Sequence, residues 1–214
     1  MRILLIILLS IVAPFTYGQL VTWNLGGPSP TTGRELSLAP TFVKEGITVS
    51  DLSKGSLVKS RQGNARGFSG HLAKDVRTFD EAFENNAYFE FSIGVNKGHA
   101  LSVSALDAKL RVQEFSAKNF QWTYSLDGTD FKNLHETPIQ VSNLSNSGSN
   151  QPSLDLSQIE DLQNIKARTK VTFRLYVWGN DNSQDKAKLS VGFGKSDAKN
   201  NSPVLKIEGS ITKS

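Results

Sequence analysis

The sequence predicts an all-β protein built as an antiparallel β-sandwich. Short runs in which apolar and polar residues alternate make up most of the chain after residue 18. Such alternation is typical of strands that place one face on a core. Clusters of Gly, Asn, Asp and Pro separate the runs, as the turns of a sandwich or barrel require. Helical periodicity is confined to two short stretches, so we expect at most one or two short helical turns.

The apolar members of each run should face the core. Trp23, near the start of the first predicted strand, belongs with them. The later runs contribute Phe89, Phe91, Ile93 and Val95; Leu101, Val103 and Ala105; Phe120, Trp122, Tyr124 and Leu126; Val171, Phe173, Leu175 and Val177; Leu189, Val191 and Phe193; and Leu205, Ile207 and Ile211.

The two helical stretches are short. Ser157 followed by Glu160 fits a capping box, which would start one turn of helix there. Residues 75–86 carry Val76, Phe79 and Phe83 at helical spacing and could form another turn. Neither stretch is long enough to change the fold class.

The N-terminus has the pattern of a signal peptide. Arg2 precedes an apolar run over residues 3–12, and Thr16 and Gly18 are the small residues expected before a cleavage site. We expect residues 1–18 to be removed and residues 19–214 to form a single β-sandwich domain in the extracellular space or periplasm. An uncleaved N-terminal anchor is the alternative. No second apolar stretch is long enough to span a membrane.

Composition excludes several classes of site. The chain has no cysteine, which rules out disulfides, thiolate metal sites and a cysteine nucleophile. The net charge of +4 comes from basic and acidic residues that are interspersed along the chain. Nucleic-acid binders normally concentrate Lys and Arg on one face, so we expect no nucleic-acid partner. Nothing in the sequence indicates an oligomeric state.

Six segments carry a family resemblance through their order along the chain. They are residues 21–27 (VTWNLGG), 52–56 (LSKGS), 86–93 (NAYFEFSI), 120–128 (FQWTYSLDG), 171–179 (VTFRLYVWG) and 207–211 (IEGSI). Together they resemble secreted bacterial jelly-roll domains of the galactose-binding-like (discoidin-like) type, as found in Bacteroidetes-type and PEP-CTERM-type exported proteins. The resemblance implies a jelly-roll sandwich. It implies little about function, because sandwiches host many unrelated sites.

Catalytic motifs are weak. His71, His99 and His135 are each isolated in sequence, and no Gly-x-Ser-x-Gly elbow is present. Carboxylates cluster at residues 80–84 and 160–161, on expected helical turns where solvated charges are ordinary. We therefore lean against an enzyme, and a polysaccharide lyase or hydrolase remains the least favoured alternative.

The most suggestive ligand site is one face of the strand over residues 171–178. With Phe173 and its alternate neighbours in the core, Arg174, Tyr176 and Trp178 share the opposite face. Aromatic rings beside polar donors suit a sugar, which stacks its C–H face on a ring and hydrogen-bonds through its hydroxyls. The alternative is that this row is covered and only packs.

A second candidate is the Gly-rich basic stretch over residues 54–67. We expect a surface loop in which Lys59, Arg61 and Arg66 could line a groove for an acidic polysaccharide. No phosphate-binding loop is predicted, because Gly-Lys-Ser/Thr at a helix start is missing.

We expect no cofactor. A structural calcium ion is the alternative, at residues 127–130 (DGTD) or 181–185 (DNSQD), since calcium takes several oxygen ligands. Three functions therefore stay open: a glycan-binding module, which is favoured, a structural or adhesive extracellular protein without a small-molecule site, and an enzyme.

Overall fold

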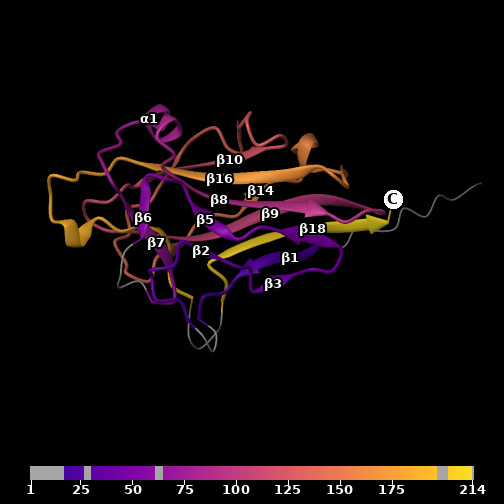
Figure 1. Ribbon diagram of the computed structural model, residues 1–214, viewed down its shortest axis with the longest axis horizontal. Coiled ribbons are helices and arrows are strands. Elements are labelled where there is room, and N and C mark those ends of the chain that lie inside the picture. The colour runs from indigo at the N-terminus through magenta and orange to yellow at the C-terminus, as the bar shows by residue number, and fades with distance from the viewer. Residues whose placement is uncertain (1–16, 27–29, 61–64, 197–201, 214) are drawn as a thin grey trace, which may run out of the picture.

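The computed structural model describes residues 17–26, 30–60, 65–196 and 202–213. Two antiparallel sheets pack face to face, which confirms the predicted β-sandwich (Figure 1). Sheet I has the strand order β3 (Phe42–Val43), β1 (Gly18–Trp23), β18 (Leu205–Lys213), β9 (His99–Val112), β17 (Val191–Phe193), β7 (Phe68–Leu72) and β6 (Val58–Ser60), and β13 (Ser149–Asn150), β14 (Leu154–Asp155) and β15 (Ile165–Lys166) also pair with β9.

Sheet II forms the other layer. Its strand order is β11 (Lys132–Asn133), β10 (Asn119–Ser125), β16 (Lys170–Trp178), β8 (Tyr88–Val95), β5 (Leu52–Lys54) and β2 (Ser37–Leu38), while β12 (Ile139–Gln140) pairs with β10 and β4 (Ile47–Val49) pairs with β8.

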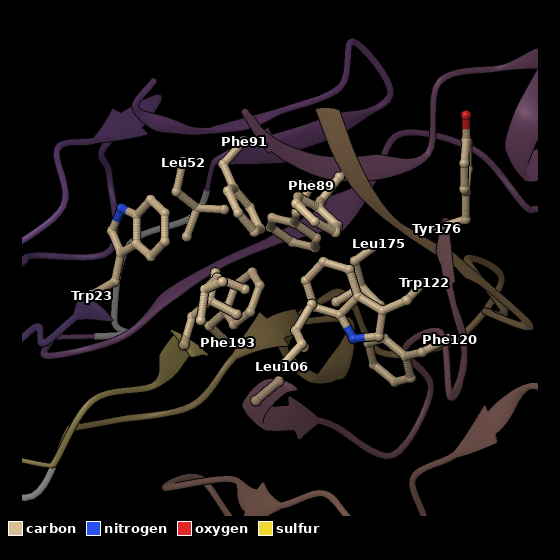
Figure 2. Packing of buried hydrophobic residues seen from close by; sticks show 14 of the residues in the cluster. Trp23, Leu52, Phe89, Phe91, Leu106, Phe120, Trp122, Leu175, Tyr176 and Phe193 are labelled. Carbon is tan, nitrogen blue, oxygen red and sulfur yellow. The ribbon is translucent and has the colours of Figure 1, made fainter. Parts of the chain in front are cut away.

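The core between the sheets is rich in aromatic rings (Figure 2). Phe91 of sheet II lies 4.9 Å from Trp23 of sheet I, and Phe89 lies 5.5 Å from Phe193, both measured between ring centroids. Nearly all the predicted core residues are buried. Leu126 is the clear exception at 38% exposed, because it lies beyond the end of β10, in the turn.

Strand β9 organises sheet I. It is fourteen residues long and pairs with β18 along its first part and with β17 along its last. In its second half Leu106, Ala108 and Leu110 are buried in the core. Asp107 and Lys109 therefore lie on the outer face of the sheet.

One α-helix is present among the described residues: α1 (Phe79–Glu84), inside the stretch where a helical turn is predicted. Thr78 caps it by accepting a hydrogen bond from the backbone N–H of Glu81. Figure 1 places α1 outside the layer that contains β16 and β8. Its position covers part of the outer face of sheet II.

The predicted capping box at Ser157 is wrong. The turn is a 3₁₀ helix, η1 (Glu160–Leu162), and its N-cap is Ile159 without a side-chain cap. Ser157 is instead part of an Asx turn, in which its backbone N–H donates to Asp155. A second 3₁₀ turn, η2 (Lys186–Lys188), is capped by Asp185.

Most of the predicted signal peptide lies outside the described residues. Strand β1 begins at Gly18, opposite Gly209, and Gln19 pairs with Glu208. Within the described residues, the structure has no helix with the length and apolar character needed to cross a membrane.

Candidate functional site

The row Arg174, Tyr176 and Trp178 does lie on the face of β16 opposite to the core residues, but that face is covered. Tyr176 is 0% exposed and Trp178 is 8% exposed. The ring of Phe79, from α1, contacts both, with centroids 5.4 Å and 5.7 Å away. In Figure 2, Tyr176 accordingly lies apart from the inter-sheet cluster. The expectation that this row offers open aromatic rings to a sugar is therefore not met.

Arg174 is held in an aromatic clamp. Its guanidinium carbon lies 4.2 Å from the ring centroid of Tyr88 and 4.0 Å from that of Phe131. Arg174 Nε donates to Glu90 Oε2 at 2.6 Å, and a terminal nitrogen donates to the Tyr176 hydroxyl at 3.2 Å. Cation–π contacts and the ion pair thus occupy both faces and the edge of the guanidinium.

The basic stretch over residues 54–67 is not a single loop. It contains β6, which pairs with β7 and places Lys59 opposite His71. Lys59 is exposed and donates to the carbonyl oxygen of Ser56. The pairing has a simple cause, since the stretch holds Val58, whose buried side chain fixes the register. Strands β17 and β7 separate Lys59 from β9.

Lys54 turns inward at the start of that stretch. Its ammonium group donates to the carbonyl oxygen of Glu35 and to Ser60, and it lies 4.1 Å from the ring centroid of Phe68. Burial lowers the pKa of Lys54 to about 8. It is a structural contact rather than part of an open basic face.

Arg66 is held at a different place, and Arg61 lies outside the described residues. Arg66 has a left-handed backbone conformation with φ of 63°. Its N–H donates to Thr31 and its carbonyl accepts from the backbone N–H of Ser196. Two segments far away in sequence therefore hold Arg66 next to the loop that follows β17.

A polar groove runs along the outer face of β9, and it is the best-formed candidate site. It encloses about 410 Å³ and has Asp107 and Lys109 on its floor. Two hydrogen bonds to β9 hold the walls in place. The Gln151 N–H donates to the Ala108 carbonyl on one side, and the Lys109 N–H donates to the Val204 carbonyl on the other. The described lining residues are Asp107, Ala108, Lys109, Asn150, Gln151, Ser153, Ser202, Pro203 and Lys206.

Asp107 of the lining of this β9 groove belongs to a small cluster of charges. Lys206 forms ion pairs with both Asp107 and Glu208, so two carboxylates meet one ammonium group. Burial raises the pKa of Asp107, but hydrogen bonds from Lys206 and Ser153 outweigh this effect and hold the pKa below its ordinary value. Asp107 is therefore a charged acceptor at neutral pH.

Basic residues gather beside Lys109, which lines the groove. Lys109 Nζ donates to the carbonyl oxygen of Lys195 at 3.0 Å. Burial lowers the pKa of Lys195, and the nearby charges of Arg111 and Arg66 lower it further. Arg111 is buried on β9 and donates to Asn146 and Ser69. We call Lys109, Lys195, Arg66 and Arg111 the cation cluster.

Gly194 allows two of the segments that carry the cation cluster to approach closely. A Cβ on Gly194 would lie 2.4 Å from the Ser147 carbonyl oxygen and 3.2 Å from Lys109 Cγ. Only glycine permits this approach of backbone to backbone. The close packing continues as the Lys195 N–H donates to Ser147 at 2.8 Å. Lys195 is therefore held beside Lys109 by main-chain contacts.

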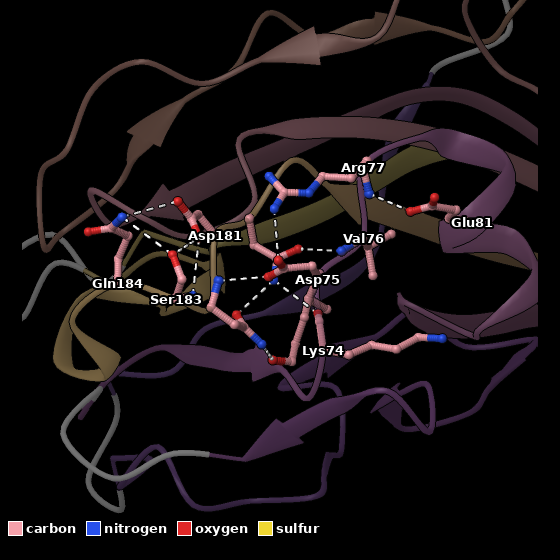
Figure 3. A network of polar contacts seen from close by, with 11 residues as sticks. Lys74, Asp75, Val76, Arg77, Glu81, Asp181, Ser183 and Gln184 are labelled. Atoms are coloured by element: carbon pink, nitrogen blue, oxygen red, sulfur yellow. Dashed lines mark hydrogen bonds and ion pairs between the residues drawn. The ribbon is translucent and has the colours of Figure 1, made fainter.

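Both loops considered for calcium form turns, and the second one also joins segments that are distant in sequence. Asp127 Oδ1 accepts from the N–H groups of Thr129 and Asp130. Asp181 accepts from Ser183 and Gln184, within the network of Figure 3. Among the described residues, no group of three or more His, Asp or Glu side chains is placed to hold a metal ion.

In the second of these loops, amide side chains join segments far apart in sequence. Asn180 accepts from Val76 and donates to the Lys74 carbonyl oxygen, and the Asn182 N–H donates to Asp75. Figure 3 shows the Lys74–Arg77 segment beside Asp181 and its neighbours. These hydrogen bonds anchor the start of α1 to the loop that follows β16.

Three further features bear on a possible catalytic site: His135 and two other hollows. His135 is bound on both ring nitrogens, to the Trp122 N–H and the Thr137 carbonyl oxygen. A second hollow, lined by His71, Asn182 and Lys186 together with apolar residues, has no carboxylate in its described lining. A third joins Tyr124, Lys132 and Asp161, and Asp161 accepts from both of the others.

Tyr124 is a poor base in that third hollow. Burial and the neighbouring Asp161 raise its pKa to about 12. At neutral pH it is therefore protonated and acts as a hydrogen-bond donor. This environment does not favour the proton abstraction that a lyase needs.

The sequence-based reasoning missed the β9 groove. Its signal was visible in part, because Asp107, Lys109 and Arg111 alternate with apolar residues and so share one face of a strand. The sequence could not reveal that Gln151, Ser202 and Lys195 would border that face. These contacts depend on loops more than forty residues away.

Comparisons with known proteins complete the description. No family model matches the chain, and a search of curated proteins gives no significant match. The fold and the side-chain geometry are therefore the basis for any functional proposal.

Proposed function

We propose that the protein is a secreted, non-catalytic binding module and that a carbohydrate bound in the β9 groove is its ligand. The observation that carries the proposal is the groove itself. It is a polar hollow on the outer face of a sheet, bordered by amides and hydroxyls, and it contains a charged acceptor and a charged donor.

The lining chemistry suits sugar hydroxyls, which both donate and accept hydrogen bonds. Asp107 is an acceptor, Lys109 a donor, and the amide of Asn150 is both. The amide nitrogen of Gln151 already donates to Ser149, so its oxygen is the group left for a ligand. The side chain of Asn150 is exposed at the rim. The floor is a strand in the middle of a sheet, so these groups sit on a rigid support, which lowers the entropic cost of binding.

The test is a glycan-array screen of the purified exported protein, followed by calorimetry on the best ligand. Asn150→Ala and Gln151→Ala should each weaken binding by about 3- to 10-fold, the range for loss of one hydrogen bond. Asn133→Ala, an exposed amide on β11 of the other sheet, is the matched control and should bind like wild type. Equal affinity for all three variants would contradict this location, and absence of any glycan ligand would contradict the function.

The second candidate is a structural or adhesive extracellular protein without a small-molecule site. The observation in its favour is the packing of Tyr176 and Trp178 beneath α1. This packing buries the aromatic face that the sequence suggests for sugar binding. An array without hits, combined with a stable fold, would favour this candidate.

A further inference from the structure

We infer that the carbohydrate bound in the β9 groove is an acidic polysaccharide whose repeating unit combines neutral hydroxyls with a carboxylate, as in polymers that contain uronic acid. The inference rests on the proposed function and names the ligand class of the same site.

The composition of the groove lining favours a charged ligand. None of its described lining residues is aromatic. A neutral sugar at an open site depends on ring stacking, because hydrogen bonds exchanged with water contribute little net free energy. Without a ring, affinity must come from charge. A ligand that carries charges of its own meets that requirement.

Lys109, Lys195 and Arg66 of the cation cluster keep donors that the described residues do not use. The Lys109 ammonium group has three donors, and the described residues accept from one of them. Among the described residues, the Lys195 ammonium group and the Arg66 guanidinium have no hydrogen-bond acceptor and no ion-pair partner. The geometry leaves these cations available for an external anion.

Main-chain contacts hold the segments that carry these cations next to one another. Gly194 and the Lys195 N–H fix one segment against Ser147, and Ser196 fixes Arg66 through its backbone. Like charges brought together cost free energy in the unbound protein, and a bound anion removes that cost. A carboxylate placed among Lys109, Lys195 and Arg66 would do so.

The pattern of charge along the groove disfavours a uniform polyanion. Asp107 in the lining and Glu208 beside it share one cation among the described residues, Lys206, so this part of the groove keeps an excess of negative charge. A continuous polyphosphate backbone would be repelled there. A polymer that offers hydroxyls there and a carboxylate beside Lys109 fits both parts.

Calorimetry with two matched oligosaccharides tests the inference. An oligogalacturonate should bind at low salt, and a neutral galactan oligosaccharide of equal length should bind at least tenfold more weakly. Raising the salt from about 50 mM to about 500 mM should weaken the oligogalacturonate several-fold, because screening shortens the reach of exposed charges. A single-stranded oligonucleotide of similar charge should bind more weakly than the oligogalacturonate.

Three variants assign the effect to the cluster. Lys109→Gln, Lys195→Gln and Arg66→Gln should each lower oligogalacturonate affinity by about 5- to 10-fold, with thermal midpoints close to wild type. Lys170→Gln, an exposed lysine on β16 of the other sheet, removes the same charge and should change affinity less than twofold.

The outcomes separate this inference from the proposed function. Salt-independent binding of the neutral oligosaccharide that depends on Asn150 but not on Lys195 would overturn the inference and leave the carbohydrate module standing. Preferred binding of the oligonucleotide would overturn the inference by identifying a different polyanion. Failure of both oligosaccharides and of every glycan on the array would overturn both.

Discussion

The ring of Phe79 meets the ring of Tyr176 edge to face, with centroids 5.4 Å apart and planes at 77°. This contact fastens α1 to the outer face of sheet II. Trp178 lies against the same Phe79 ring, 5.7 Å away between centroids. The row of Tyr176 and Trp178 is therefore a packing interface between α1 and sheet II. The stability of the folded protein should depend on this interface.

Trp178→Ala should destabilise the protein by about 3–5 kcal/mol, the usual cost of emptying a buried aromatic site. Chemical denaturation at constant pH measures the effect. Leu126→Ala is the control, since Leu126 is 38% exposed and should change stability by no more than about 0.5 kcal/mol. An unchanged midpoint for Trp178→Ala would mean that α1 does not cover this row in solution.

Glu90→Gln should cost about 1–2 kcal/mol, because it leaves the clamped Arg174 without its charged partner. The two side chains are only 28% and 19% exposed, so solvent screens the pair weakly. The matched control is Glu114→Gln, whose ion pair with Lys188 is about half exposed and should contribute little. Equal effects of the two substitutions would argue against the clamp.

Most of the fold could be predicted from the sequence, because period-two alternation is a local property of strands. The same pattern predicts that Arg174, Tyr176 and Trp178 lie on the outer face, but alternation does not tell whether that face is exposed to solvent. Six residues of α1, which lie almost a hundred positions before Trp178, decide that question. The cation cluster was equally out of reach, since Arg66, Lys109 and Lys195 come from three distant segments.

Stability should rise with pH up to about pH 6.5 through His135. Its Nδ1–H donates to Thr137 and its Nε2 accepts from the Trp122 N–H, so the folded state needs the neutral ring. Burial lowers the pKa of His135, and the hydrogen bond to Thr137 only partly offsets this. The unfolded chain, with a pKa of about 6.5, then binds more protons than the folded protein as pH falls.

The stabilisation from His135 is therefore fully present above about pH 6.5 and is lost as pH falls towards the lowered folded pKa. Urea denaturation at several pH values measures the slope. His135→Gln should flatten it. A slope that survives in His135→Gln would assign the effect to other groups.

Processing at Gly18 should leave Gln19 as the first residue of the exported protein. Such a cut removes one residue of β1, Gly18, and keeps the pairing of Gln19 with Glu208. Intact-mass measurement of secreted protein would show loss of residues 1–18. Retention of Met1 in the exported form would contradict the signal peptide.

The location of the ligand is tested most directly by NMR titration of ¹⁵N-labelled protein with an oligogalacturonate. The largest amide shifts should map to residues 107–111, 150–153 and 194–196, and the amides of Tyr176 and Trp178 should stay unperturbed. Shifts concentrated on β16 and α1, or no shifts at any ligand concentration, would contradict the assignment of the β9 groove as the binding site.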